Sequence, residues 1–388
     1  MDFCFSSEDK EFEKEVDYFL QSAVSKEIVD EVESGLGFGQ HSWDFLRKVG
    51  AKRWLTPTWP KRYGGMEVSH TRRLIILDRM AYYRCPSTLV GVSIVGPSLM
   101  VFGTEEQKEK FLLPIARAEI EFSLGYTEPN SGSDLASLQT KAVRKGDSYI
   151  VNGQKMFNTR VHYSNYHWLL VRTDPDAPKH KGLSLFILDL KSPGITVTPI
   201  WCIDGERTNM VYFDDVRVPA NYLVGEENQG GRVAIHALEY ERIMFGVVGA
   251  YQRIFEELVA YTKVTRRNGK FLAEDPLIRQ KLAQLAIELS VVRLLGYRTA
   301  WMLDNNKRST YESVVLKVFN TEFSKRLANT GMQILGPYGP IRKDSKWAQL
   351  RGAVELEYRA CLFKTIGAGS TEILKTAIAQ RGLGLPRK

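Results

Sequence analysis

One stretch of the chain, Phe122–Asp134, combines residue types that can bind a polar ligand through the backbone. Pro129 and Gly132 impose turns, and turns leave backbone N–H groups outside regular hydrogen-bond ladders. The small polar residues of the stretch add donors without bulk, and they are Asn130, Ser131 and Ser133. Successive donors of this kind can wrap an anionic ligand. The alternative is a surface linker, because polar turns commonly do no more than connect elements.

Several familiar nucleotide and hydrolase motifs are absent from the sequence. It has no GxGxxG after a predicted strand, no GxxxxGK[ST] loop and no GxSxG elbow. A nicotinamide, ATP or serine-hydrolase function therefore lacks support. The missing GxGxxG does not exclude FAD, because flavoproteins use more than one fold.

The cysteines and histidines show no pattern of a metal site. The cysteines are far apart and form no CxxC pair, and they are Cys4, Cys85, Cys202 and Cys361. There is no HExxH, and we expect His162 and His167 to be surface or packing residues. This pattern argues against a disulfide scaffold and a structural zinc site, and it fits a reducing compartment.

The composition is typical of a globular protein with several domains. The chain has 388 residues, of which 44% are hydrophobic and 25% charged. The net charge is +8, but 53 basic residues are scattered among 45 acidic ones without a basic stripe, so nucleic-acid binding is not indicated. The first residues include acidic ones and no apolar run, and no stretch reaches membrane-spanning length. We therefore expect a cytoplasmic protein.

The hydrophobic period changes twice along the chain and predicts an α+β fold, mainly α. Residues 1–120 have helical spacing and predict an N-terminal helical domain. Residues 121–230 are rich in β-branched and aromatic runs and predict a middle β-barrel-like domain. Residues 231–388 return to the helical period and predict a C-terminal four-helix bundle.

Two details of this prediction concern boundaries. Asn152-Gly153 follows an apolar run and is a strong signal for a hairpin turn. The four helices of the bundle are predicted over Gly231–Val264, Pro276–Asp304, Thr310–Leu335 and Ser345–Ile366.

Taken together, these features resemble the acyl-CoA dehydrogenase family, and the resemblance covers nearly the whole chain. The segments that carry it are Thr127–Asp134, Asn152–Met156, Phe213–Pro219, Glu241–Arg242, Gln333–Gly336 and Ile366–Ile373. One such segment would be a weak signal. Six of them in this order, on a helix–strand–helix plan, are specific.

The resemblance implies an FAD site between the β domain and the bundle. It implies that the isoalloxazine ring is lined by Leu124, Tyr126, Thr127, Phe157, Asn158 and Thr159, with the Thr159 hydroxyl near flavin N5. Ser133 would lie where the flavin and CoA segments meet. The dinucleotide would contact Gln333, Gly336, Ser370 and Glu372. Arg266 would lie at the adenine end, although Arg266-Arg267-Asn268-Gly269 departs from the family's more common form.

The resemblance also implies a carboxylate base, because the α-proton of an acyl thioester is only weakly acidic. Many members of the family carry this glutamate at the position of Ala368, which has no acidic group. A subset carries it on a bundle helix before an arginine, as in Glu241-Arg242. Glu241 is therefore the predicted base and Arg242 its electrostatic neighbour, with Glu239 as the rival. The backbone N–H of Ala368 would still donate to the thioester carbonyl.

The acyl group is not fixed by these residues. Alanine at position 368 leaves room for a branched, cyclic or aromatic acyl group. Arg84 lies near the place where the similar glutaryl-CoA dehydrogenases carry an arginine for a distal carboxylate, so a dicarboxylic acyl group is a second hypothesis. The alternative for Arg84 is a surface charge at a helix end.

The resemblance implies partners and leaves three function classes open. An acyl-CoA dehydrogenase would pass electrons to an electron-transfer flavoprotein or a similar acceptor. The alternatives are a flavin oxidase or monooxygenase on the same fold, and an FAD-binding or stabilising subunit of a heteromeric dehydrogenase. Because the family shares its flavin site between subunits, we expect an oligomer, a dimer or tetramer.

Overall fold

The computed structural model describes residues 5–87, 89–307, 309 and 311–386, without the side chains of residues 238–243. Its contacts divide the chain into two compact units. The first, here the sheet unit, comprises Ser25–Val68 and Pro86–Glu241. The second, here the bundle unit, comprises Met1–Val24, Ser69–Cys85 and Arg242–Lys388. The division of the sequence at about residues 120 and 230 stays a prediction.

The helices of the sheet unit are short. They are α2 (Lys26–Val32), α3 (Gln40–Ala51), α5 (Gly96–Phe102), α6 (Glu105–Ala116) and α7 (Gly230–Glu241), with a π-helical turn over Gly91–Val95 before α5. α6 begins with a capping box, in which Thr104 and Gln107 each accept the other's backbone N–H. The Gln107 side chain also donates to the carbonyls of Asn221 and Leu223, and these bonds fix α6 to the residues that follow the last strand of the sheet.

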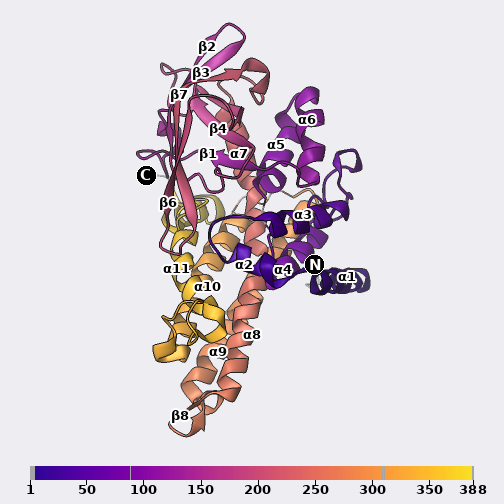
Figure 1. Ribbon diagram of the computed structural model, residues 1–388, viewed down its shortest axis with the longest axis vertical. Helices are drawn as coiled ribbons and strands as arrows, with labels where there is room; N and C mark the ends of the chain where they lie inside the picture. Colours follow the sequence, from indigo (N-terminus) through magenta and orange to yellow (C-terminus); the bar gives the residue numbers. More distant parts are fainter. Residues whose placement is uncertain (1–4, 88, 308, 310, 387–388) are drawn as a thin grey trace. The chain divides into compact units, whose positions relative to one another are not determined.

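Seven strands form one sheet (Figure 1). They are β1 (Phe122–Gly125), β2 (Lys141–Lys145), β3 (Ser148–Lys155), β4 (Tyr166–Arg172), β5 (Leu183–Asp189), β6 (Ile195–Trp201) and β7 (Arg207–Pro219). The order is β1-β4-β2-β3-β7-β6, and β5 pairs with β4. β1 runs parallel to β4, whereas the β2–β3, β3–β7 and β6–β7 pairs are antiparallel. The buried face includes Tyr149, Leu169 and Phe186.

The predicted hairpin turn at Asn152-Gly153 is wrong. The turn lies at Gly146-Asp147, between β2 and β3, and Asn152-Gly153 continues β3. Two residues of β7 oppose Asn152 there, which is a β-bulge. Gly153 has φ 141°, and a Cβ on it would lie 2.7 Å from the Thr140 Cα. The glycine therefore serves a close approach of two backbones and not a turn.

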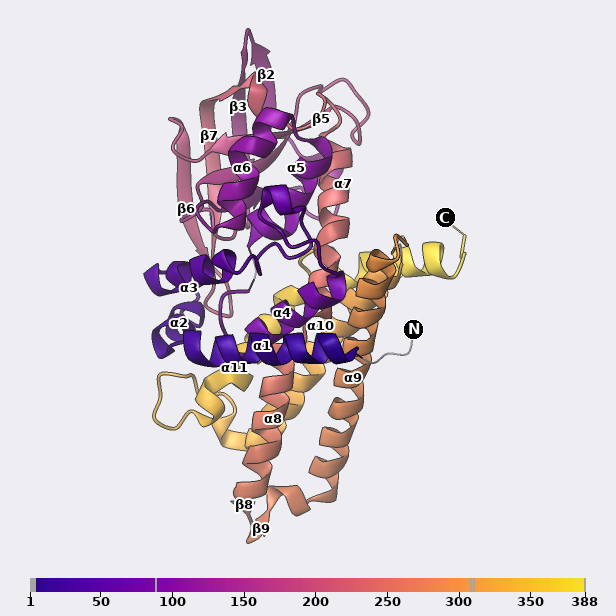
Figure 2. The same ribbon diagram turned by 90° about the vertical axis from the view of Figure 1, so that its right-hand side faces the viewer.

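The bundle unit holds the longer helices and two from the first part of the chain. Its helices are α1 (Ser7–Ala23), α4 (His70–Tyr82), α8 (Gly249–Val264), α9 (Pro276–Asp304), α10 (Glu312–Leu335), α11 (Ala353–Lys364) and α12 (Thr371–Ala377). α8 and α9 run side by side and are joined by the hairpin of β8 (Arg266–Arg267) and β9 (Lys270–Phe271) (Figure 2). Leu258, Leu289 and Phe323 lie in their shared apolar core with α10.

The prediction of one helix over Gly231–Val264 is wrong. α7 ends at Glu241, a 3₁₀ turn follows over Arg242–Gly246, and α8 begins at Gly249. A Cβ on Gly249 would lie 1.9 Å from the Asp78 carbonyl oxygen, so α4 and α8 pack backbone to backbone at this point. The helical period continues through the break, which is why the pattern alone does not show it.

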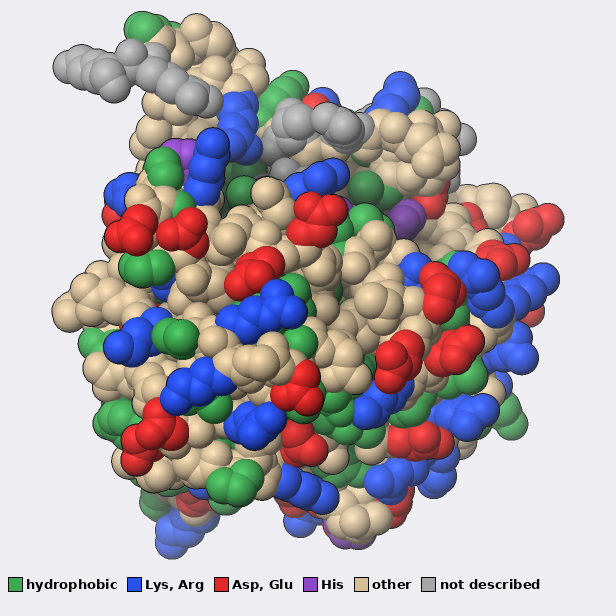
Figure 3. Space-filling model, turned by 90° about the horizontal axis from the view of Figure 1, so that it is seen from above, with side chains coloured by type: hydrophobic (Ala, Val, Ile, Leu, Met, Phe, Trp, Pro, Cys, Tyr) green, Lys and Arg blue, Asp and Glu red, His purple; other side chains and the backbone are tan. Residues whose placement is uncertain are grey.

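Two surface properties bear on function. Acidic and basic side chains are interspersed over the face shown in Figure 3, as the scattered charges of the sequence predict. Among the helices that the structure describes, none combines the length and the apolar character that a bilayer crossing requires.

Candidate functional site

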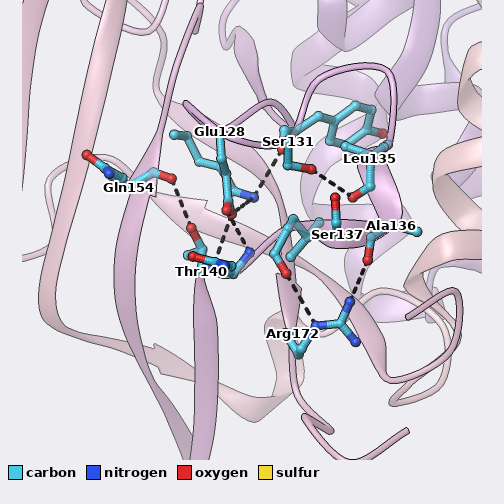
Figure 4. A network of polar contacts seen from close by, with 12 residues as sticks. Glu128, Ser131, Leu135, Ala136, Ser137, Thr140, Gln154 and Arg172 are labelled. Atoms are coloured by element: carbon cyan, nitrogen blue, oxygen red, sulfur yellow. Dashed lines mark hydrogen bonds and ion pairs between the residues drawn. The ribbon is translucent and has the colours of Figure 1, made fainter. Parts of the chain in front are cut away.

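The turn-rich segment after β1 is fixed by a buried carboxylate (Figure 4). Glu128 accepts hydrogen bonds from the backbone N–H groups of Gln139 (2.6 Å) and Thr140 (2.9 Å). The fully buried Lys155 donates to Glu128 (2.8 Å) and to the Tyr126 carbonyl (3.1 Å). One ion pair thus ties the end of β1 to β3 and to the start of β2.

The electrostatics of this pair follow from burial and proximity. Burial opposes ionisation of Glu128. The Lys155 ammonium and the other hydrogen-bond donors to the Glu128 carboxylate outweigh this effect, so the pKa of Glu128 is lowered. Burial lowers the pKa of Lys155 to about 8, although Glu128 opposes that shift. Removing either partner leaves the other charged group in an apolar environment.

One arginine, Arg172, joins the residues that follow Asp134 to the loop after β4. Arg172 donates to the carbonyls of Leu138 (3.3 Å) and Ala136 (2.7 Å), and also to those of Lys179 and Lys181. Ser131 is buried and donates to the carbonyls of Asp134 (2.8 Å) and Leu135 (3.3 Å). Figure 4 shows Ser131 beside Leu135. Ser133 stays exposed on the loop. The segment is therefore a loop held in place by hydrogen bonds, and its outer face is open to a ligand.

A hollow of about 410 Å³ lies beside this loop. Its lining includes Ser137, Gln139 and the basic side chains of Lys141, Arg172 and Lys179. Basic side chains beside a turn with small polar residues favour an anionic ligand such as a phosphate.

The residues expected to line the flavin come together within the sheet unit. Leu124 and Thr127 are half-buried, and Tyr126 is buried with its hydroxyl accepting from Trp168 (3.1 Å). The Thr127 carbonyl accepts from the backbone N–H of Met156 (2.8 Å), which brings the end of β1 next to the segment that starts at Phe157.

The segment Phe157–Thr159 is a loop with a defined conformation. Phe157 is 54% exposed and has a left-handed φ of 58°. Asn158 is fully buried and bonds Asn209 through its backbone N–H (2.9 Å), and its Oδ1 has no hydrogen-bond partner among the described residues. The Thr159 hydroxyl lies 3.2 Å from that of Thr208. An exposed aromatic in a left-handed conformation is not a core residue, which favours a ligand-facing role for Phe157.

Two further buried titratable groups lie in the sheet unit, and sequence reasoning did not single out the second, Glu121. His167, expected at the surface or in packing, lies fully buried 2.7 Å from the Ser123 hydroxyl, and burial together with Lys155 lowers its pKa to about 3. Glu121 accepts from the backbone N–H groups of Val90 (2.6 Å) and Gly91, and burial raises its pKa to about 7. Nothing in the sequence distinguishes these residues from exposed ones.

In the bundle unit, the segment around Ala368 forms an exposed loop before α12. Ala368 and Gly369 both have left-handed φ angles, 53° and 96°. Ser370 caps α12 by accepting from the Ile373 N–H, and Glu372 is exposed in its first turn. Sequence reasoning also missed Lys317, a buried lysine of α10 that donates to the Gly369 carbonyl (2.8 Å).

Three of the proposed dinucleotide residues, Gln333, Gly336 and Arg266, lie in or near the β8–β9 hairpin. Gln333 is exposed and accepts from Lys281, and Gly336 has φ 58°. Arg266 packs on the Phe271 ring at 4.0 Å and donates to Gly269. Arg267, which sequence reasoning did not single out, donates to the Ile334 carbonyl (2.9 Å) and thus holds the turn at Gly336.

The predicted base and its neighbours lie outside the described side chains. The backbone places Glu241 at the last residue of α7 and Arg242 at the first residue of the following turn. The side chains of Glu239, Glu241 and Arg242 are not described, so their roles stay predictions. Asp78 holds the start of α8 after this turn, because its Oδ1 accepts from the N–H groups of Val248 (2.6 Å) and Gly249 (2.8 Å).

Arg84 is engaged within the bundle unit. Its Nη2 donates to both carboxylate oxygens of Glu257, at 2.7 and 3.0 Å, and its side chain is 12% exposed. This contact gives Arg84 a structural partner that the sequence did not indicate. Its role towards a distal carboxylate stays a prediction.

Comparison with known proteins agrees with the resemblance. The N-terminal, middle and C-terminal domains of acyl-CoA dehydrogenases match residues 6–119, 123–216 and 228–383. The acyl-CoA dehydrogenase FadE26 of Mycobacterium tuberculosis is 34% identical over 100% of this chain and 99% of its own length. FadE29 of the same organism is 36% identical over 98% and 97%.

Solved structures give the same result at the level of the fold. The Tcur3481-Tcur3483 steroid acyl-CoA dehydrogenase is 35% identical, with a TM-score of 0.94 and full coverage of both chains. The ChsE4-ChsE5 complex from Mycobacterium tuberculosis is 33% identical, with a TM-score of 0.93 and full coverage of both chains. The chain therefore belongs to the acyl-CoA dehydrogenase family, a family of flavoprotein oxidoreductases with an N-terminal helical domain, a middle sheet domain and a C-terminal helical domain.

Proposed function

We propose that the protein binds FAD and converts an acyl-CoA with a bulky, cyclic acyl group to the 2-enoyl-CoA. The observation that carries the proposal is the joining of Tyr126–Thr127 to Phe157–Thr159 through the Met156 hydrogen bond. These segments present half-buried hydroxyls and an exposed aromatic, which suit one face of a flat heterocycle. FAD, when bound, accepts the hydride that leaves the β-carbon.

The remaining steps belong to side chains and backbone groups of this chain. Glu241, as the base, takes the α-proton, and the Arg242 guanidinium favours its ionised form. The Ala368 N–H donates to the thioester carbonyl oxygen and stabilises the negative charge that develops there. The left-handed conformation of Ala368 and Gly369 exposes this backbone and supports that role.

The choice of a bulky cyclic acyl group has two supports. Position 368 carries a methyl group. The resemblance implies a glutamate at this position in many members of the family, so alanine leaves space beside the thioester. A full-length structural relative at 35% identity is named a steroid acyl-CoA dehydrogenase. The basic hollow at Lys141, Arg172 and Lys179 suits the phosphates of CoA.

We also propose that the protein acts as an oligomer that passes electrons to an electron-transfer flavoprotein or a similar acceptor. The end of α11 and the residues after it leave apolar side chains exposed, among them Leu362 (46%), Phe363 (45%) and Ile366 (69%). Such a cluster favours contact with another subunit. Two structural relatives are named as pairs of different chains, so a second, different chain is an alternative to a second copy.

The test is an anaerobic titration of the purified protein with straight, branched, polycyclic, aromatic and dicarboxylic acyl-CoAs. We expect the absorbance of oxidised flavin to be lost with the polycyclic class and retained with the dicarboxylic class. A protein that retains no FAD when produced alone would instead support the role of a partner-dependent subunit.

An oxidase is the second candidate, because the prolyl acyl carrier protein oxidase AnaB is 26% identical with a TM-score of 0.86. Admitting air after reduction separates the two functions. Rapid reoxidation with release of peroxide would favour the oxidase.

A further inference from the structure

One buried lysine of the bundle unit contacts the loop that carries Ala368. Lys317 lies in the first half of α10 with 1% of its surface exposed. Its ammonium donates to the Gly369 carbonyl at 2.8 Å and lies 5.9 Å from the centre of the Phe245 ring. Among the described residues, no carboxylate forms an ion pair with it. Burying an ammonium costs free energy, because the charged group loses its water. A buried lysine whose hydrogen bond goes to a loop carbonyl therefore suggests that the position of this loop matters for function.

The loop itself has a conformation that alanine rarely adopts. Ala368 and Gly369 are both left-handed, and a left-handed alanine places its Cβ against the next carbonyl. The ends of the loop are closed by a hydrogen bond from the Thr371 N–H to the Thr365 carbonyl (2.9 Å). Its middle is exposed, and the Lys317 contact holds the carbonyl of Gly369, the residue that directly follows Ala368. A charged donor makes a stronger hydrogen bond than a neutral one.

The same face of α10 also holds the turn that follows α7. Asn320, one helical turn beyond Lys317, donates from Nδ2 to the Phe245 carbonyl at 2.7 Å. Asn320 is buried, and its Oδ1 accepts from the Tyr251 hydroxyl at 3.4 Å, which fixes the orientation of the amide. Phe245 lies in the turn that begins at Arg242. One face of α10 therefore touches both the loop of Ala368 and the turn directly after Glu241.

We propose that Lys317 is a positioning residue for dehydrogenation, which fixes the Ala368–Gly369 backbone so that the Ala368 N–H stays aimed at the thioester oxygen. The proposal rests on the proposed function, because that function gives the Ala368 N–H its task. Lys317 does not touch the reacting atoms. Its loss should lower kcat and leave the binding of the CoA part little changed.

The contact is sensitive to pH in a range that an assay can reach. Burial lowers the pKa of Lys317 to about 8, and the carboxylates of Glu322 on α10 and Glu372 on α12 oppose the shift. Above this pH the ammonium becomes a neutral amine and donates a weaker hydrogen bond. The loop should therefore loosen, and kcat should fall, as the pH rises through about 8.

The first test is hydrogen exchange of the amides of residues 365–374 in the full-length protein, which needs neither substrate nor FAD. We compare the unaltered chain, Lys317→Met and Lys317→Arg. Lys325→Met is the matched control, because Lys325 lies on the same helix but is 42% exposed and pairs with Glu322 at 3.4 Å. We expect about tenfold faster exchange in Lys317→Met, partial recovery in Lys317→Arg, and no change in Lys325→Met.

The second test is the pH dependence of kcat with the acyl-CoA that reduces the unaltered protein. Lys317→Met should lower kcat about tenfold or more with KM changed less than threefold, and it should lose the alkaline fall near pH 8. Unchanged exchange, or faster exchange with unchanged kcat and pH profile, would overturn the proposal. If the unaltered protein is reduced by no acyl-CoA, the proposed function fails first, and the positioning role fails with it.

Discussion

Replacing Glu128 by alanine should destabilise the sheet unit more than any exposed ion-pair mutation. The substitution leaves Lys155, which is fully buried, without the carboxylate at 2.8 Å. It also removes the acceptor for the N–H groups of Gln139 and Thr140. A buried pair that loses one partner costs about 3–5 kcal/mol, since the remaining charge stays desolvated.

The magnitude can be separated into parts by a double-mutant cycle. Lys155→Met leaves the Glu128 carboxylate with its two backbone donors, so we expect a smaller loss of roughly 2–3 kcal/mol. Replacing both residues, as Glu128→Ala with Lys155→Met, removes both charges and should cost less than the sum of the two single changes. A coupling free energy of at least about 1 kcal/mol is expected for groups in direct contact.

The assay is urea denaturation at pH 7, followed by intrinsic fluorescence and circular dichroism. The control is Asp134→Ala, because Asp134 pairs with Lys179 at a similar distance of 2.7 Å but both side chains are more than half exposed. The control should leave the unfolding curve unchanged. A loss below about 1 kcal/mol for Glu128→Ala, or equal effects of Glu128→Ala and Asp134→Ala, would refute the reasoning that burial sets the strength of this pair.

Two further predictions concern the sheet unit. Gly153→Ala should cost about 2–4 kcal/mol in denaturation experiments, because φ is 141° and the new Cβ would lie 2.7 Å from Thr140 Cα. Gly146→Ala, at a turn with φ 63° and open space, should cost only about 1 kcal/mol, and equal costs would contradict the bulge argument. Because burial raises the pKa of Glu121 from 4.5 to about 7, the folded protein binds this proton more tightly than the unfolded chain, and stability should fall by about 3 kcal/mol as the pH rises through that window. In Glu121→Gln, the free energy of unfolding should change less with pH between about pH 5 and 7 than in the unaltered protein. An unchanged pH dependence would exclude Glu121 as its source.

The hydrophobic pattern predicted the order of the elements but not their breaks. The strands between Phe122 and Val218 and the long helices α9 and α10 follow from period and composition. The prediction of a turn at Asn152-Gly153 was wrong because the sequence does not distinguish a glycine required by a close backbone approach from one required by a turn. The break after Glu241 was missed because the apolar period continues through it.

The resemblance names the segments of the candidate site but not the residues that support them. The structure joins Thr127 to Phe157–Thr159 through Met156, and the flavin-lining role of these residues stays a prediction. Lys155 and Lys317 were not singled out, because burial is a property of the fold and a lysine is usually exposed. The partners of such residues are backbone carbonyls or distant carboxylates, which no local pattern records.

The measurement that tests the central claim most directly is reduction of bound flavin by the acyl-CoA found in the titration, compared between Glu241→Gln and Glu239→Gln. Flavin content and circular dichroism serve as the control for folding. We predict that Glu241→Gln retains the flavin and lowers the rate of reduction by at least about 10³-fold, whereas Glu239→Gln is reduced at nearly the unaltered rate. A Glu241→Gln protein that is reduced as fast as the unaltered one would contradict the assignment of the base.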